Sequence, residues 1–246
     1  MARIITSEWR KLRSTPTMWW LLAGAVLLCA VGAVGGLMVA DVGKQPLNTG
    51  EGLRAALHAV GAGAVLAEVA GIIGMAGEFR FGQADQTFLS EPRRGRVLTA
   101  KVVVFTAVGL AFGVVSAAAT LGASWVWLTV KGAGLPFGQP IIWSNLGGGV
   151  ASAALDALLG VAVGAVLRNQ VVAIVTVLAV QAGVESAVFQ ASTSVGRWLP
   201  ARAGEALRQL PTEGLLSWQM GAIVLSAWVA GLLIAGATRT LRTDIT

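Results

Sequence analysis

The sequence predicts an all-α polytopic membrane protein with six transmembrane helices, and three observations lead to that fold class. Hydrophobic residues make up 55% of the 246 residues and charged residues only 12%, about half the charged fraction of a typical soluble domain. The mean hydropathy is +0.74. The apolar residues are gathered in long runs, and a run of about 20 such residues can cross a bilayer as a helix. This composition excludes a disordered chain, a collagen, a coiled coil and a disulfide-rich secreted module.

Six apolar runs are long enough to cross a membrane, and we expect them to form one transmembrane domain over residues 1–246. The first is too long for the core of a signal peptide, so we expect it to be retained as a span. Only Arg168, Asn169 and Gln170 separate the fourth run from the fifth, which predicts a tight helical hairpin. The six runs are Met18–Ala40, Leu57–Gly77, Ala100–Val130, Ser144–Leu167, Val171–Phe189 and Leu215–Ala237.

The distribution of Lys and Arg residues sets the expected orientation. With a cytoplasmic N-terminus, twelve of these 18 residues fall in inside segments and six in outside segments, as the positive-inside rule requires. The net charge of +6 is then explained by anchoring of the inside segments beside anionic lipid, so no nucleic-acid partner is expected. We therefore expect a multi-pass plasma-membrane protein, surrounded by the lipid bilayer, with both termini cytoplasmic.

Two shorter segments are expected to be interfacial helices. One face of the N-terminal segment carries apolar residues at helical spacing, namely Ile4, Ile5, Trp9 and Leu12, and we assign Glu8 and the basic residues to the rest of its surface. This pattern predicts an amphipathic helix at the inner surface. In the last outside segment, apolar residues at helical spacing between prolines 200 and 211 predict an external interfacial helix between spans five and six, either flat or partly re-entrant. Its charged residues are expected to point away from the protein; they are Arg202, Glu205 and Arg208.

The sequence lacks the motifs of the common enzyme classes. The only Gly-Lys pair, Gly43-Lys44, is followed by Gln45, so there is no phosphate-binding P-loop. The single histidine, His58, excludes an H-E-x-x-H zinc site, and the single cysteine, Cys29, excludes a disulfide or a cysteine cluster. We expect no catalytic residue, no metal site and no cofactor bound to this chain.

Polar side chains within the predicted spans are the first group of candidate site residues. Glu68, Asp156 and Glu185 are intramembrane carboxylates, and Gln181 lies four residues before Glu185, so an α-helix would place both on one face. Ionisable groups in a bilayer are costly and usually face a cavity or a partner. Two interpretations stay open: these residues line a substrate pathway or a subunit seam, or they only hold neighbouring helices together.

The second group lies in the inside segment between spans two and three, over residues 77–101. A plain connection would not need Phe79, Phe81, Phe88 and Leu89 on the aqueous side. Apolar residues flanked by charge indicate a docking surface, and residues 83–89 are expected to form a short helix. The alternative is a basic, solvated segment that anchors to lipid, which would best explain Arg93, Arg94 and Arg96.

Three motifs resemble permease subunits of type-2 ATP-binding-cassette (ABC) transporters, in their compact six-span form. The inside segment resembles the family pattern G-E-[YF]-R-x-G-T, a short helix and T-P-x-R-R-x-R, although Gln83 and Glu91 replace two threonines. Ser7–Thr17 resembles the family's N-terminal elbow helix, and Leu158–Gln170 its hairpin between spans four and five. The matching residues of the inside segment are Glu78, Phe79, Arg80, Gly82, Thr87, Phe88, Leu89, Pro92, Arg93, Arg94, Arg96 and Lys101.

The resemblance implies a function that would explain the missing P-loop. ATP and magnesium would be bound by a separate ATPase, present in two copies, and two permease copies or close paralogues would pair around the pathway, with export the expected direction. The alternatives are an ion-coupled secondary transporter or channel that uses the intramembrane carboxylates, or an intramembrane carboxylate enzyme. The resemblance assigns ATPase coupling to Glu78, Arg80, Gln83, Gln86, Thr87, Phe88 and Leu89, and the elbow helix to Glu8, Trp9 and Lys11.

Overall fold

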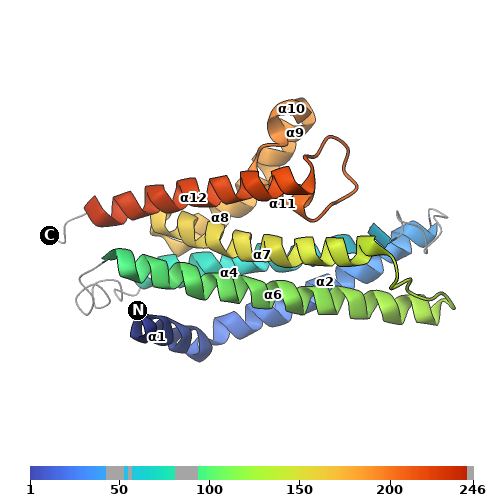
Figure 1. The fold of residues 1–246 in the computed structure, drawn as a ribbon, viewed down its shortest axis with the longest axis horizontal. Helices are drawn as coiled ribbons and strands as arrows, with labels where there is room; N and C mark the ends of the chain where they lie inside the picture. Colours follow the sequence, from blue (N-terminus) through green and yellow to red (C-terminus); the bar gives the residue numbers. More distant parts are fainter. Residues whose placement is uncertain (43–52, 55–56, 81–93, 243–246) are drawn as a thin grey trace.

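The computed structural model describes residues 1–42, 53–54, 57–80 and 94–242. Over these ranges the chain is helical and contains no strand. The long helices run side by side, and α1 lies at the same end of the bundle as the end of α12 (Figure 1). The elements are α1 (Ala2–Ser14), α2 (Pro16–Val42), η1 (His58–Val60), α4 (Gly61–Arg80), α6 (Arg94–Val130), α7 (Pro140–Leu167), α8 (Gln170–Ala179), η2 (Val180–Glu185), α9 (Ser186–Ala191), α10 (Thr193–Gly196), α11 (Pro200–Leu207) and α12 (Trp218–Arg242).

The prediction of six membrane-spanning helices is confirmed for the described residues. Six segments are long and apolar enough to cross a bilayer, and they correspond one to one with the six predicted runs. The largest difference is at the third span, which begins at Gly95, because α6 continues through a polar turn before its apolar part. The spans are Pro16–Val39, His58–Phe79, Gly95–Val130, Pro140–Leu167, Gln170–Ala191 and Trp218–Arg239.

Helices α4 and α7 form the centre of the bundle, and α2, α8 and α12 lie at its outside with apolar side chains exposed. Glycines permit the close approach of α4 and α7. A Cβ atom at Gly71 would collide with the carbonyl oxygen of Ala157, and one at Gly160 would collide with that of Glu68. Small residues at such positions let helix backbones meet directly, as membrane helices often do.

The predicted hairpin between spans four and five is present. Arg168 ends α7 in the left-handed conformation, with φ of 54°. The side chain of Asn169 then begins α8 by accepting hydrogen bonds from the backbone N–H groups of Val171 and Val172, each at 3.1 Å. Such an N-cap satisfies two of the N–H groups that have no partner at the start of a helix. A connection as short as Arg168 and Asn169 is therefore enough to end α7 and begin α8.

The fifth span departs from a regular α-helix. Residues Val180–Glu185 form a π-helical turn, η2, between α8 and α9. A π-helix closes its hydrogen bonds over five residues rather than four. Gln181 and Glu185, which were predicted to share one face, take different partners: Gln181 donates to Glu68, and Glu185 accepts from the backbone of Ala201.

Helix α11 is the predicted external helix, and it folds back against the spans. Its apolar residues Ala203, Ala206 and Leu207 are buried, and the helix packs against α12 and α7. The prediction that Arg202 and Arg208 point away is wrong. Both guanidiniums point into the bundle, where Arg208 meets Asp156 and Ser152 of α7 and Arg202 donates to Ser186 of the fifth span.

Candidate functional site

The structure places the polar candidates in two groups, at different levels of the bundle. We call the first the N-terminal charge cluster, and it consists of Glu8, Lys11, Glu78 and Lys101. We call the second the carboxylate cavity, and it is lined by residues that include Glu68, Asp156, Gln181 and Arg208. Each group joins helices that are far apart in the sequence.

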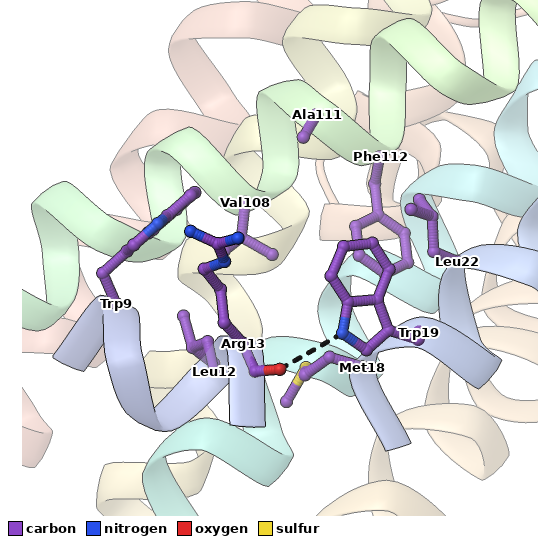
Figure 2. Close-up of a pocket in the computed structure, with 9 residues that line it drawn as sticks. All are labelled: Trp9, Leu12, Arg13, Met18, Trp19, Leu22, Val108, Ala111 and Phe112. Carbon is purple, nitrogen blue, oxygen red and sulfur yellow. Dashed lines mark hydrogen bonds between the residues drawn. The ribbon is translucent and has the colours of Figure 1, made fainter. Parts of the chain in front are cut away.

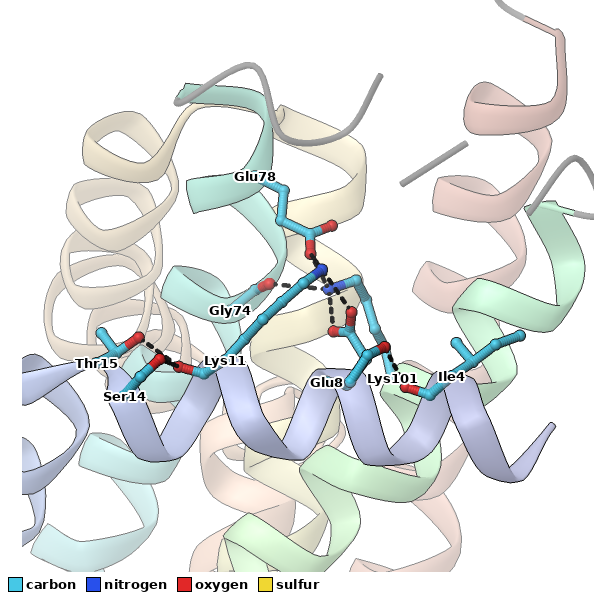
Figure 3. Close-up of polar contacts among 9 residues, drawn as sticks. Ile4, Glu8, Lys11, Ser14, Thr15, Gly74, Glu78 and Lys101 are labelled. Atoms are coloured by element: carbon cyan, nitrogen blue, oxygen red, sulfur yellow. Dashed lines mark hydrogen bonds and ion pairs between the residues drawn. The ribbon is translucent and has the colours of Figure 1, made fainter. Parts of the chain in front are cut away.

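Three helices contribute to the N-terminal charge cluster (Figure 3). Glu8 and Lys11 lie three residues apart on α1, a spacing that places them on neighbouring positions of a helix surface. Glu78 lies near the end of α4, and Lys101 lies near the start of α6. Glu8 was predicted to lie on the polar face of α1, and this was wrong: its side chain is buried against α4 and α6.

The cluster pairs each ammonium with both carboxylates. Lys101 Nζ lies 2.7 Å from Glu8 Oε2 and 2.9 Å from Glu78 Oε1, and it donates to the carbonyl oxygen of Gly74 at 3.2 Å. Lys11 Nζ lies 2.8 Å from Glu8 Oε1 and 2.9 Å from Glu78 Oε1. Only 2% of the Lys101 side chain is exposed. A buried ammonium is tolerated when its charge and its hydrogen bonds are both satisfied, and this arrangement meets both conditions.

The pKa values of the two α1 residues follow from this pairing. Burial alone would raise the pKa of Glu8, but attraction to Lys101 and the hydrogen bonds from both ammoniums outweigh it, so the pKa lies below the ordinary value. Burial alone would lower the pKa of Lys11, but the hydrogen bonds to Glu8 and Glu78 raise it above its ordinary value. Both residues therefore stay charged at neutral pH, and the cluster holds two positive and two negative groups.

The position of the cluster in the chain connects α1 to the segment between spans two and three. Glu78 lies three residues before residues 81–93, and Lys101 lies eight residues after them. The coupling candidates Gln83, Gln86, Thr87, Phe88 and Leu89 lie outside the described residues, as does the side chain of Arg80. The cluster therefore fixes both flanks of this segment to one amphipathic helix.

Trp9, the third residue assigned to the elbow helix, does not join the cluster. It borders an apolar groove of about 110 Å³ between α1, α2 and α6 (Figure 2). Across this groove, the indole Nε1 of Trp19 donates a hydrogen bond to the carbonyl oxygen of Arg13 at 3.3 Å. This contact fixes the angle between α1 and α2, so α1 is held to the bundle on both of its sides.

The carboxylate cavity has a volume of about 300 Å³ and lies between α4, α7, the fifth span and α11. Gln181 Nε2, on the π-helical turn, donates to Glu68 Oε2 at 2.8 Å. The second oxygen of Glu68, Oε1, is buried and has no hydrogen-bond partner within the described part of the chain. Three of the four predicted pathway residues therefore meet at one cavity: Glu68, Asp156 and Gln181.

Arg208 enters the cavity from just beyond the end of α11. Its Nη1 lies 3.8 Å from Asp156 Oδ2 and donates to Ser152 Oγ at 3.2 Å. Asn145 Nδ2 donates to the carbonyl oxygen of Arg208 at 2.6 Å. Asn145, Ser152 and Asp156 all contact Arg208 from α7.

Glu185, the fourth predicted pathway residue, does not line the cavity and instead holds α11 in place. Its Oε2 accepts a hydrogen bond from the backbone N–H of Ala201 at 2.9 Å. Arg202 donates to Ser186 Oγ at 2.8 Å and pairs with Glu205 Oε2 at 2.7 Å. The fifth span and the first turn of α11 are therefore linked by two polar contacts.

Sequence reasoning missed that Arg208 faces Asp156 and that Arg202 contacts the fifth span. A signal for them was present: the segment between prolines 200 and 211 carries both arginines, while the carboxylates of neighbouring spans lack a cation of their own. No group of three or more His, Cys, Asp or Glu residues that could hold a metal ion occurs among the residues searched, which are those that the structure describes. No protein-family model matches the chain, and no curated protein matches it significantly.

Proposed function

We propose that the chain is the membrane-spanning permease subunit of an ABC transporter, an exporter whose spans form the substrate pathway and whose ATP is hydrolysed by a separate ATPase. The observation that carries this proposal is the N-terminal charge cluster. It joins α1 to both flanks of residues 81–93, the segment that resembles the ATPase-docking loop of such permeases. Six spans and an amphipathic N-terminal helix agree with the same architecture.

The physical argument concerns how force would travel. A docking loop that hangs from two independent helices would bend when an ATPase moves it, and the spans would not follow. Here Lys101, on one side of this segment, forms ion pairs with Glu78 on its other side and with Glu8 of α1. A shift of the loop would therefore move α1, α4 and α6 together, and rigid-body movement of such a unit can change access to a pathway.

The proposal includes the partners that this mechanism needs. Two ATPase copies would bind ATP and magnesium, and each would receive the docking segment of one permease, with Phe88 and Leu89 as the apolar centre of the contact. A second permease copy or a close paralogue would complete the pathway. The outward-facing apolar residues of α2, α8 and α12 would contact lipid or that second copy.

An ion-coupled secondary transporter is the second candidate, and one observation favours it. The oxygen Oε1 of Glu68, which has no hydrogen-bond partner among the residues that the structure describes, lies within the bundle, where a carboxylate could carry a cation or a proton across the membrane. The two candidates differ in their energy source. Transport by the ABC permease would need ATP and an ATPase subunit, whereas the secondary transporter would need only an ion gradient.

The test is to co-express the chain with an ABC ATPase encoded beside its gene and to reconstitute both in proteoliposomes. We expect a stable complex whose ATP hydrolysis depends on the permease. Phe88→Ala should lower that hydrolysis at least tenfold while the variant still inserts into membranes, and Phe137→Ala, at the end of the bundle opposite α1, is the matched control. Full transport by the chain without any ATPase, or full coupling in Phe88→Ala, would refute the assignment.

A further inference from the structure

The carboxylate of Glu68 has an unused acceptor inside the bundle. Only 1% of Glu68 is exposed, Gln181 satisfies Oε2, and Oε1 has no partner among the described residues. A buried polar atom without a hydrogen bond is costly, and for an ionised carboxylate the cost is larger still. The unsatisfied oxygen of Glu68, which is buried beside a cavity, therefore requires an explanation.

The charges around the cavity do not supply a partner for Glu68. Three carboxylates line it, from Glu68, Asp156 and Glu205, against two guanidiniums. Arg202 is engaged with Glu205 and Ser186, and Arg208 is directed to Asp156 and Ser152. Within the described part of the chain, no cation forms an ion pair with Glu68. Among the described residues of the lining, carboxyl groups outnumber guanidiniums by one, and Glu68 is the carboxyl group that no guanidinium contacts.

The rest of the lining restricts the kind of cation that would fit. The side chains of Val65, Leu178 and Ala182 give the cavity an apolar wall. The amide oxygen of Gln181 is a second acceptor, since its nitrogen already donates to Glu68. A divalent metal ion prefers several oxygen ligands, and the described residues hold no cluster of three ligating side chains. An ammonium group offers N–H donors for two acceptors, and an apolar body attached to it would contact the wall.

From this geometry we propose that the carboxylate cavity is a binding site for a small primary organic amine, whose ammonium group pairs with Glu68 and whose apolar part lies against Val65 and Leu178. The volume of about 300 Å³ is at the lower end for small-molecule sites. The π-helical turn contributes by presenting Gln181 to Glu68, and such turns are frequent at functional sites.

Helix α11 closes one side of this site. It is held by the contact of the Ala201 N–H with Glu185 and by that of Arg202 with Ser186. Amine binding within one subunit requires neither ATP nor a second subunit. The inference thus goes beyond the proposed function, and binding can be measured whether or not an ATPase drives the chain.

The test measures binding of 2-phenylethylammonium to the purified full chain in lipid nanodiscs, by isothermal titration calorimetry. We expect saturable binding to the wild-type protein, and binding of the neutral analogue 2-phenylethanol at least tenfold weaker, because a charge-assisted hydrogen bond is lost. The quaternary N,N,N-trimethyl analogue, which has no N–H donor, should also bind at least tenfold more weakly. These comparisons use only the wild-type protein, so they do not depend on how a variant folds.

Two matched variants locate the site. Glu68→Gln keeps the shape of the side chain and removes its charge, and we expect it to weaken amine binding at least tenfold. Glu213→Gln removes an exposed carboxylate outside the cavity and should bind as the wild type does. The proposal is overturned if the wild type does not bind the amine, if the alcohol binds equally well, or if a monodisperse Glu68→Gln variant binds it unchanged.

Discussion

Lys101 and Glu8, 93 residues apart in the sequence, form an ion pair of 2.7 Å in which both side chains are almost completely buried. The pair joins the amphipathic helix α1 to the third span. It is part of a cluster whose charges balance, so removing one member leaves the others buried without full compensation. Stability and coupling should therefore depend on the same four residues.

Replacement of Lys101 by Met should be strongly destabilising. The variant would keep the volume of the side chain but leave Glu8 and Glu78 with Lys11 as their only cation in the cluster, and breaking a buried ion pair costs about 3–5 kcal/mol. Thermal unfolding of the purified chain, followed by tryptophan fluorescence, measures the effect. Lys131→Met, at an exposed position, is the control and should change stability by about 0.5 kcal/mol or less. Equal melting temperatures for both variants would contradict the role of the cluster.

The cluster should also make stability depend on pH in the acid range. The pKa of Glu8 is lower in the folded protein than its ordinary value of 4.5, so the folded state binds this proton less readily than the unfolded state. The stabilisation is therefore complete above pH 4.5 and is lost as the pH falls through the lower, folded value. The difference in melting temperature between the wild type and Glu8→Gln should shrink from pH 6 to pH 3, and a difference that grew on acidification would contradict the assignment.

The contact between α4 and α7 predicts opposite effects for two Gly→Ala substitutions. At Gly160 a Cβ atom would collide with the backbone of Glu68, and overpacking of this kind costs about 1–3 kcal/mol. At Gly122, in α6, a Cβ atom would meet nothing within 4 Å, so the higher helix propensity of Ala should add about 0.5–1 kcal/mol. Melting temperatures of both variants in the same detergent test this, and a Gly160→Ala variant as stable as Gly122→Ala would be inconsistent with the direct backbone contact.

The predicted orientation can be tested by cysteine labelling. Cys29, the only cysteine, is fully buried, so a Cys29→Ala background removes it. In intact cells, a membrane-impermeant maleimide should modify Gly138→Cys, at the end of the bundle opposite α1. It should modify Ser14→Cys, in α1, only after the cells are permeabilised, because the basic residues around α1 favour the cytoplasm. The reverse pattern would invert the topology.

The regular features of the fold were predictable because hydropathy determines them locally. The six spans and the hairpin at Arg168–Gln170 follow from the lengths and spacing of the apolar runs. The burial of Glu8 was also encoded, since Ile4, Glu8 and Leu12 repeat every four residues and so share one face of α1. The prediction placed Glu8 on the solvated face because of its charge, although its position in this repeat placed it on the buried face.

The polar site could be predicted only in part. Glu68, Asp156 and Gln181 were expected to face a cavity or a partner, because charged groups in a bilayer avoid lipid. Hydropathy does not predict that Arg208 lies beside these residues, since a charged helix in an outside segment could equally well point its charges into water. The π-helical turn contacts α11 and has no signature in the apolar pattern of the fifth span.

The π-helical turn at Val180–Glu185 also bears on how the fifth span would align with related chains. Such a turn holds one residue more than the α-helix around it needs. Deletion of a single residue there would restore regular α-helix without rotating the rest of the span, because the wider π-helical turn accommodates one extra residue in nearly the same total rotation. Glu185 and Ser186 would then still face α11. A relative with a one-residue gap at this place would therefore share the six spans and hold the segment after the fifth span as this chain does.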